Sequence, residues 1–269
     1  MKKVYFMLLT LLVMVTSIQV TTAQAATTDS QWLSTANLSE GVIGIDYSVP
    51  KDKRTKLMIT KDNSSYTYNL YASEQSEDFP LQQGNGTYKV TILENTTGNK
   101  YRTVYSDEVE LSLTNTNVVY LNSVQNIKWS SSDKAIQQAQ QLTQGLSTDE
   151  AKVKAIYNYV VKNVQYDYTL ASSIPTDYIP SIDKTLTGKK GICYDYSSLF
   201  AAMLRSVDIP AKLVMGKTSY VTEYHAWNEV LLNGKWVTID TTVDAGMIKN
   251  KKTVELIKSA TKYSTAKVY

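Results

Sequence analysis

The segment 189-KKGICYDYSSLFAAMLR-205 contains Cys193, the only cysteine among the 269 residues of the chain. Gly191 supplies backbone freedom just before it. Four apolar residues at helical spacing then mark a buried helix face: Leu199, Phe200, Met203 and Leu204. The pattern predicts that Cys193 lies in the first turn of a helix. Unpaired amide N–H groups and the helix dipole lower the pKa of a thiol there, and the backbone N–H of the cysteine can stabilise an oxyanion.

A single cysteine can serve several purposes. Exported proteins usually use cysteines in pairs, so an odd one indicates a reactive thiol or an intermolecular bridge. A buried, inert cysteine that packs as a small hydrophobic residue is the alternative. Composition alone favours the inert cysteine, and the choice depends on the partners that the rest of the chain offers.

Residues 1–25 have the three-part order of a secretory signal peptide. Lys2 and Lys3 form a basic head, an uncharged apolar run follows over residues 5–20, and 23-AQA-25 provides small residues at alternate positions. The run is shorter than the ~20 apolar residues that a membrane span needs. We therefore expect cleavage after Ala25 and no membrane association afterwards. The mature protein is then secreted, and either extracellular or associated with the cell wall.

The charge of the chain is close to balanced. The formal net charge of +3 falls to +1 once Lys2 and Lys3 are removed. Because no basic stripe stands out either, we expect no polyanion, and in particular no nucleic acid, as a partner.

Hydrophobic residues recur with period two in the first half of the mature chain. The alternation is clear in 42-VIGIDYSV-49 and in 87-TYKVTIL-93, and clusters of turn-forming residues separate such runs. Short alternating strands at this spacing predict an antiparallel β-sandwich of immunoglobulin-like type over residues 26–125. The chain has no Cys-Trp-Cys arrangement, so the pattern predicts the class of fold and not a true immunoglobulin domain.

The period changes near Trp129. A capping box is predicted in 147-STDE-150, with Ser147 as the N-cap. Five residues behind it recur along one stripe of an amphipathic helix: Val153, Ile156, Tyr157, Val160 and Val164. We expect residues 126–269 to form a second domain with an α+β fold.

The only histidine, His225, opens the segment 225-HAWNEVLLNGKWVTIDTT-242. Asn233-Gly234 is the strongest short signal for a β-hairpin, and a two-residue turn determines the register of the two strands. Leu232 is then expected to pair with Lys235.

Continued along the hairpin, this register brings an aspartate to the histidine. Trp227 would meet Asp240 and His225 would meet Thr242, so that His225 and Asp240 lie diagonally on one face, within reach of each other. A carboxylate in that place holds an imidazole in one tautomer and stabilises its protonated form.

The order of these residues resembles the transglutaminase-like superfamily, whose architecture is related to that of papain. The histidine follows the cysteine by 32 residues, and the aspartate follows the histidine by 15. The resemblance extends roughly from Val118 to Thr242. Its matching blocks are 191-GICYDYSSLFAAMLRSVDIPAKLVMG-216, 224-YHAWNEV-230 and 236-WVTIDTT-242, preceded by 159-YVVKNVQYDYT-169.

The resemblance implies a Cys-His-Asp catalytic triad. Cys193 is implied as the nucleophile, His225 as the base and later the acid, and Asp240 as the residue that orients the histidine. The signal peptide and the N-terminal β-sandwich fit a secreted bacterial member of the superfamily.

Other positions near this core lie outside the implied triad. Gln165, Tyr166 and Tyr168 are candidates for the second oxyanion donor, with a structural role as the alternative for each. Asn228 departs from the superfamily pattern, because a small apolar residue often occupies that place. Asp195 is expected to stabilise the first turn of its helix rather than to take part in chemistry.

A metal or cofactor is not expected. One cysteine, one histidine and one aspartate fall short of the four ligands of a structural zinc site. The sequence also lacks a calcium-binding loop of alternating acids and a phosphate-binding glycine loop.

The superfamily implies that Cys193 attacks a carboxamide or peptide carbonyl to form a thioester. Hydrolysis of the thioester would make the protein a cysteine peptidase or amidase, and attack by an amine would make it a cross-linking transglutaminase. Hydrolysis is favoured, because no calcium site or pro-segment typical of regulated cross-linkers is visible. A non-catalytic protein that binds the cell envelope with the same fold is the third possibility. The expected partner is a protein or peptide substrate, with the cell envelope as one place where it could occur.

Overall fold

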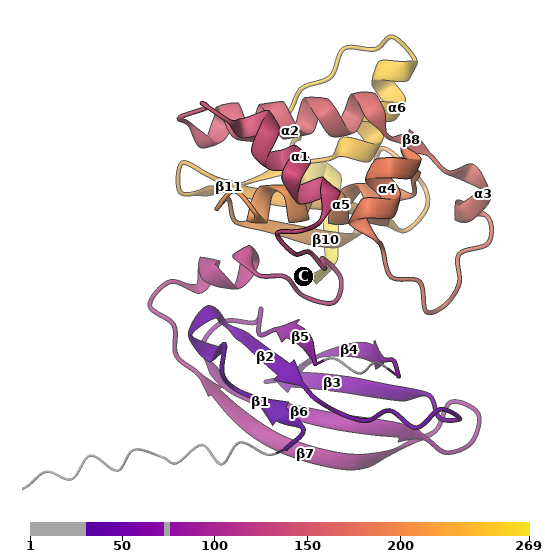
Figure 1. Ribbon diagram of the computed structural model, residues 1–269. Coiled ribbons are helices and arrows are strands. Elements are labelled where there is room, and N and C mark those ends of the chain that lie inside the picture. The colour runs from indigo at the N-terminus through magenta and orange to yellow at the C-terminus, as the bar shows by residue number, and fades with distance from the viewer. Residues whose placement is uncertain (1–30, 73–75) are drawn as a thin grey trace, which may run out of the picture.

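The computed structural model describes residues 31–72 and 76–269, and the predicted signal peptide, residues 1–25, lies outside them. The described residues form a β-sandwich domain and a domain of helices around a sheet, each with its own hydrophobic core (Figure 1). The mixed fold class expected from the sequence is confirmed. The connecting segment, residues 112–133, includes the 3₁₀ helix η2 (Thr116–Leu121). The domain boundary expected near residue 125 stays a prediction. None of the described helices is long and apolar enough to cross a membrane.

The first domain consists of two antiparallel sheets. One has the strand order β1-β2-β5, with β1 at Leu33–Ser34, β2 at Val42–Ile45 and β5 at Glu77–Pro80. The other has the order β4-β3-β6-β7, with β3 at Thr55–Lys61, β4 at Ser64–Leu70, β6 at Gly86–Asn95 and β7 at Tyr101–Leu111. A 3₁₀ helix, η1 (Leu38–Glu40), precedes β2.

The face predicted to be buried in β6 is buried, although Thr91 on the opposite face is buried as well. Tyr88, Val90 and Ile92 are completely buried in the core of the sandwich. An N-terminal region built from antiparallel sheets is therefore confirmed, whereas the immunoglobulin-like type stays a prediction.

The alternation predicted for residues 42–49 is only partly right. β2 ends at Ile45, so Tyr47 and Val49 lie beyond the strand, and all four residues of β2 are buried. Ile43 and Ile45 belong to the core of the sandwich, whereas Val42 belongs to the core of the second domain. The strand has no solvent-facing side because the second domain covers Val42, and the side chains of Ser34, Ser76 and Asp78 surround Gly44.

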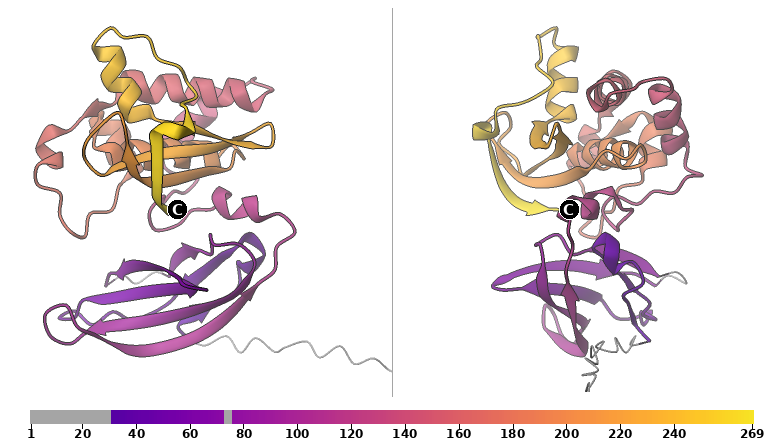
Figure 2. Two further views of the ribbon diagram at one scale, coloured as in Figure 1. Left: turned by 180° about the vertical axis from the view of Figure 1, so that it is seen from behind. Right: turned by 90° about the vertical axis from the view of Figure 1, so that its left-hand side faces the viewer.

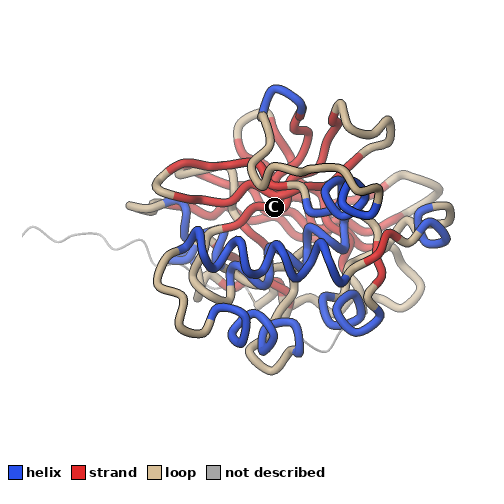
Figure 3. The backbone as a smooth tube through the Cα atoms, turned by 90° about the horizontal axis from the view of Figure 1, so that it is seen from above, coloured by secondary structure: helices blue, strands red, loops and turns tan. Residues whose placement is uncertain are grey.

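The second domain packs helices against an antiparallel sheet of order β12-β11-β10-β13. Seen from above, the helices gather mainly on one side of the strands (Figure 3). The sheet consists of β10 (Ala211–Thr218), β11 (His225–Leu232), β12 (Lys235–Ile239) and β13 (Tyr263–Val268). The longer helices are α1 (Lys134–Thr143), α2 (Asp149–Asn163), α4 (Ile182–Gly188), α5 (Cys193–Arg205) and α6 (Thr241–Lys249). The short elements are β8 (Gln165–Tyr166), α3 (Tyr168–Ala171), β9 (Lys190–Gly191) and η3 (Ala260–Lys262).

Helix α5 is the centre of this domain. It packs on β10 and β11 on one side and on α1, α2 and α4 on the other. The four apolar residues predicted to form its buried face are completely buried: Leu199, Phe200, Met203 and Leu204. The predicted helix with Cys193 in its first turn is therefore confirmed.

The stripe predicted for α2 is buried, but its N-cap lies one residue later than predicted. Thr148, not Ser147, caps the helix, and its hydroxyl accepts the Ala151 backbone N–H at 3.2 Å. Glu150 does not close a capping box. Its side chain instead accepts a hydrogen bond from the Asn233 side chain in the hairpin turn.

The β11–β12 hairpin has the predicted register over most of its length. Leu232 pairs with Lys235, and the ladder continues to the pair of Asn228 and Ile239. Beyond that pair the prediction is wrong, because β12 ends at Ile239 and α6 begins at Thr241, so that β12 does not extend opposite Trp227 and His225.

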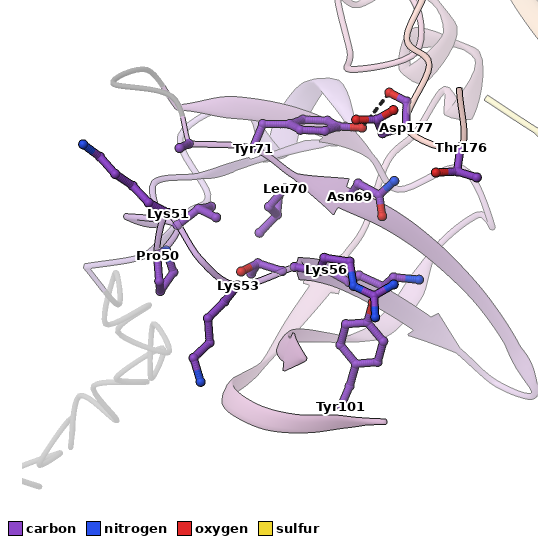
Figure 4. Close-up of a pocket in the computed structure, with 14 residues that line it drawn as sticks. Pro50, Lys51, Lys53, Lys56, Asn69, Leu70, Tyr71, Tyr101, Thr176 and Asp177 are labelled. Atoms are coloured by element: carbon purple, nitrogen blue, oxygen red, sulfur yellow. Dashed lines mark hydrogen bonds between the residues drawn. The ribbon is translucent and has the colours of Figure 1, made fainter. Parts of the chain in front are cut away.

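The junction between the two domains contains a hollow of about 440 Å³. It is lined by residues 49–51, 53–56, 69–72 and 101 of the sandwich and by residues 176–177 of the second domain. Across it, the Tyr71 hydroxyl donates to the Asp177 backbone carbonyl at 3.0 Å (Figure 4). The Cys-His-Asp group predicted from the sequence does not line this hollow, so the hollow is a feature of the domain junction.

Candidate active site

Cys193 is the first residue of α5, and Ile192 is the N-cap. The thiol is partly exposed. The Asp195 carboxylate accepts the Ile192 backbone N–H at 2.8 Å and the Tyr178 hydroxyl at 2.6 Å. Asp195 therefore stabilises the first turn of the helix, as predicted. Cys193, as the first residue of α5, lies at the helix end where backbone N–H groups have no partner within the helix.

Gly191 is required for a different reason from the one predicted. Its backbone does not adopt the positive φ that favours glycine. A Cβ atom at this position would instead lie 2.6 Å from Asp195 Cβ, which is closer than two carbon atoms that are not bonded to each other can approach. The glycine is needed because the chain before Cys193 passes directly against the side chain that caps α5.

His225 begins β11 and is almost fully buried. Its Nε2 atom lies 2.9 Å from Asp240 Oδ2. The diagonal contact predicted between these two side chains is therefore formed, although the two backbones are not paired there. Because Nε2 is occupied by the carboxylate, Nδ1 is the ring nitrogen left for the thiol of Cys193.

Asp240 is completely buried and serves two elements at once. As the N-cap of α6, it accepts the Val243 backbone N–H on Oδ1 at 3.0 Å. Its Oδ2 accepts hydrogen bonds from His225 and, at 3.0 Å, from the Tyr263 hydroxyl. The carboxylate that faces the histidine is thus held on both of its oxygens.

The surroundings of His225 favour its protonated form. Burial alone would lower the pKa of the imidazole, but hydrogen bonds to Asp240 and Cys193, together with their negative charges, raise it from 6.5 to about 10. An imidazolium of this kind stabilises a neighbouring thiolate, which is the nucleophilic form of cysteine. The imidazole of His225 can therefore carry a positive charge beside the thiol of Cys193 near neutral pH.

The three candidates for the second oxyanion donor lie on or beside β8, which pairs with β9 just before Cys193. Tyr166 is partly buried, and burial first, then the charge of Cys193, raise its pKa to about 12. Gln165 is exposed, and the Tyr168 side chain is 76% exposed, with its ring against that of Tyr166. Of the three, the structure brings Tyr166 into electrostatic contact with the thiol.

Two further residues hold this group together. Asn228 is completely buried and donates to the backbone carbonyls of Ser197 in α5 and Lys212 in β10, at 2.9 and 3.0 Å. The sequence marked Asn228 only as a departure from the superfamily pattern. Tyr263 carried no signal at all, because it lies 23 residues beyond Asp240 in a segment without a clear period.

The part of the chain that the structure describes contains no cluster of three or more His, Cys, Asp or Glu residues placed to hold a metal ion. Cys193, His225 and Asp240 are engaged with one another instead.

Comparison with known proteins points to one superfamily. Residues 136–241, which include Cys193, His225 and Asp240, match the family model described as the Transglutaminase-like superfamily. Human kyphoscoliosis peptidase is 29% identical over 117 residues, and its mouse counterpart is 28% identical over 117 residues. The match covers 40% of this chain but only 18% of the length of either relative.

Two solved structures are similar at a lower level. A candidate cysteine protease from Cytophaga hutchinsonii has a TM-score of 0.44 and 18% identity, with 81% of this chain and 82% of that chain covered. The periplasmic domain of TgpA from Pseudomonas aeruginosa has a TM-score of 0.40 and 16% identity, with 61% of this chain and 72% of that chain covered.

Proposed function

We propose that the protein is a thiol enzyme that forms an acyl-enzyme on amide groups of proteins or peptides, a proposal supported by the match of residues 136–241 to the transglutaminase-like family model. The observation that carries the proposal is the 2.9 Å contact between His225 Nε2 and the buried Asp240 carboxylate, next to a cysteine at the start of a helix. Cys193 acts as the nucleophile, His225 as the base and acid, and Asp240 as the orienting residue.

The reaction starts from the ion pair of Cys193 and His225. The thiolate attacks the carbonyl carbon of the substrate, and the new C–S bond leaves a negative charge on the carbonyl oxygen. His225 gives its proton to the amide nitrogen, the C–N bond breaks, and the amine leaves. The remaining thioester is then attacked by water or by a second amine, whose proton returns to His225, and the thiolate is released.

The oxyanion of this reaction would lie at the start of α5. As the first residue of the helix, Cys193 has a backbone N–H that no carbonyl of the helix accepts, so this N–H can donate to the developing charge. We propose Tyr166 as the second donor, because its hydroxyl stays protonated and the charge of Cys193 acts on it. Gln165 and Tyr168 remain the alternatives.

Asp240 serves the reaction by controlling the histidine. With Nε2–H donated to the carboxylate, the imidazole is held with Nδ1 toward the thiol, and its positive charge is compensated in a buried site. An aspartate that turned away would leave the ring free to rotate and would remove that compensation. The three hydrogen bonds on the carboxylate make such a turn unfavourable.

Hydrolysis is the proposed fate of the thioester. The support comes from the curated relatives, which carry the name peptidase and share 29% and 28% identity over the matched residues. The enzyme would act as a peptidase or amidase outside the cell or at the cell envelope, because the first 25 residues have the order of a signal peptide.

The test combines thiol reactivity with product analysis. The rate at which iodoacetamide alkylates Cys193 is measured from pH 5 to pH 10 in the mature protein and in His225→Ala. We expect rapid alkylation already below pH 7 in the unchanged protein, and in the variant an onset near the ~8.5 of a free thiol. Peptide cleavage and incorporation of a fluorescent primary amine are then compared, with Cys193→Ala as the control.

Each outcome selects one function. Cleavage products that disappear in Cys193→Ala support the peptidase, and incorporation of the amine that disappears in the same variant would make the protein a cross-linking enzyme. Turnover that survives Cys193→Ala would overturn the assignment of the nucleophile. A thiol that reacts only near pH 8.5, or not at all, would favour the non-catalytic binding protein.

A further inference from the structure

Tyr263 binds the same carboxylate oxygen as the histidine does. Its hydroxyl donates to Asp240 Oδ2 at 3.0 Å, and His225 Nε2 lies 2.9 Å from that atom. The second oxygen, Oδ1, accepts the Val243 backbone N–H at 3.0 Å. Because the carboxylate is completely buried, these three protein donors determine its orientation.

The ring of Tyr263 packs against an aromatic neighbour, and its hydroxyl acts as a hydrogen-bond donor. It lies against Trp227, with ring centroids 4.9 Å apart, and Trp227 is stacked next to His225. Burial, then the negative charge of Asp240, raise the pKa of the Tyr263 hydroxyl far above its usual range. The hydroxyl therefore stays protonated throughout the pH range in which a thiol enzyme works.

The strand that carries Tyr263, β13, lies at the edge of the sheet. β13 pairs antiparallel with β10, from Tyr263 opposite Thr218 to Val268 opposite Val214, with an irregularity beside Gly216. Gly216 allows the close approach, because a Cβ atom there would lie 2.1 Å from the Ser264 carbonyl oxygen. From the candidate active site, the strand runs down to the junction with the sandwich (Figure 2).

The other end of β13 is held by the β-sandwich. Lys267 Nζ donates to the Ser65 carbonyl at 2.8 Å and lies 4.3 Å from the centre of the Tyr66 ring. The Val268 backbone N–H donates to the Tyr66 hydroxyl at 3.2 Å, and the Val268 carbonyl accepts from Gln82 Nε2 at 3.1 Å. The six residues of β13 thus span roughly 20 Å between the sandwich and the candidate active site.

We propose that Tyr263 is a positioning residue of the Cys-His-Asp group and that the β-sandwich keeps it in place by holding β13. The proposal rests on the proposed function and assigns a role to the first domain. Tyr263 acts through Asp240, because its hydroxyl keeps Oδ2 directed at the imidazole. The sandwich contributes by fixing the far end of the strand, so that the hydroxyl is presented at hydrogen-bonding distance.

Other titratable groups surround the same carboxylate and histidine. From α6, Asp244 lies beside Asp240 and forms an ion pair with Lys258 at 2.6 Å. From α2, Tyr157 donates to Asp244 at 2.8 Å. Glu223, two residues before His225, interacts electrostatically with His225. Tyr220 interacts with Tyr263. None of these side chains is changed in the variants below, so their contributions cancel in each comparison.

The first experiment measures the pH profile of Cys193 alkylation by iodoacetamide in Tyr263→Phe, which keeps the ring and removes the hydroxyl. Tyr105→Phe is the matched control, because the Tyr105 side chain is 47% exposed on the sandwich. We expect the alkylation rate at pH 6 to fall about tenfold, as for the loss of one hydrogen bond to a charged group, with the midpoint moving to higher pH. The control should keep the profile of the unchanged protein.

The second experiment loosens the far end of the strand. Tyr66→Phe combined with Lys267→Met removes two bonds that the sandwich makes to β13 and leaves the candidate active site unchanged. We expect a shift in the same direction, with a decrease of roughly threefold at pH 6. Lys249→Met, at an exposed position on α6, is the control for the lost charge. Thermal unfolding shows that each variant is folded.

The outcomes separate this proposal from the proposed function. If the thiol of the unchanged protein is not reactive below pH 7, the proposed function fails. A second case is that the thiol is reactive and His225→Ala slows its alkylation, but Tyr263→Phe leaves the midpoint of the pH profile unchanged or lowers it. Only the positioning role is then overturned, because the hydroxyl would merely reduce the negative charge that Asp240 presents to His225. A double variant that behaves like the unchanged protein would remove the role of the sandwich. With the substrate found in the acyl-transfer assay, Tyr263→Phe should lower kcat and leave KM within about twofold.

Discussion

Asn228 in β11 donates a hydrogen bond to the backbone carbonyl of Ser197 in α5 at 2.9 Å. The acceptor lies four residues after Cys193, and the donor lies three residues after His225. This buried bond joins the helix that begins with the thiol to the strand that begins with the imidazole. The same side chain reaches β10 through the Lys212 carbonyl at 3.0 Å.

Replacement of Asn228 should loosen this connection. We expect Asn228→Ala to lower the free energy of unfolding by about 1–3 kcal/mol, because buried carbonyls lose their donor, and to slow alkylation of Cys193 at pH 6. Urea unfolding and iodoacetamide labelling measure the two effects. Asn250→Ala is the control, since Asn250 is exposed and its side chain donates to the Gly246 carbonyl of the adjacent helix α6, and it should change stability by less than about 0.5 kcal/mol. Equal losses in both variants would contradict the role of Asn228.

Gly191 should tolerate no side chain. We expect Gly191→Ala to destabilise the protein by about 1–3 kcal/mol, because the new Cβ atom would lie 2.6 Å from Asp195 Cβ and displace the carboxylate that caps α5. Thiol reactivity below pH 7 should fall with it. Gly188→Ala is the matched control, because Gly188 is the last residue of α4 and no atom lies within 4 Å of its Cβ position. That variant should be neutral or more stable by up to about 1 kcal/mol.

The stability of the protein should depend on pH through His225. Hydrogen bonding to Asp240 raises the pKa of the imidazole above its unfolded value of 6.5, so the stability it contributes is complete below pH 6.5 and is lost as the pH rises through the folded pKa. In Cys193→Ala the thiol does not titrate and no longer raises the pKa of His225, so that Asp240 alone does. We therefore expect stability to fall as the pH rises above 6.5, over a range that ends below the value of about 10 of the unchanged protein. The slope should stay under about 1.4 kcal/mol per pH unit, the limit for one proton.

The control for this prediction removes the titrating ring. In Cys193→Ala combined with His225→Gln, the decrease between pH 6.5 and 10 should disappear, while any contribution from other groups remains. Urea unfolding at four pH values measures both variants. Parallel curves for the two proteins would show that the pKa of His225 is not raised by folding.

Export should remove the first 25 residues. Expressed from the full chain in a bacterial secretion host, the protein in the medium should begin at Ala26, which mass spectrometry of the intact protein measures. Leu11→Arg combined with Leu12→Arg breaks the apolar run that a signal peptide needs and should keep the protein inside the cell. Retention of residues 1–25 on the exported protein would contradict the predicted cleavage.

Much of the fold and part of the candidate site could be predicted from local patterns. The turn Asn233-Gly234 determined the hairpin register as far as Asn228 and Ile239. The helical spacing behind Cys193 identified the buried face of α5, and the single cysteine and single histidine left one possible pair. These features follow from the sequence because they depend on residues a few positions apart, where turn geometry and the helical period act directly.

Contacts between distant segments were decided only by the tertiary structure. Asp240 leaves the hairpin to cap α6, Tyr263 returns on β13 to bind it, and Val42 is buried by the second domain rather than exposed. Asn228 and Gly191 matter because of what packs against them. The positions of such partners depend on how whole helices and sheets fill space together, and the periodicity of one segment carries no information about the segment that will cover it.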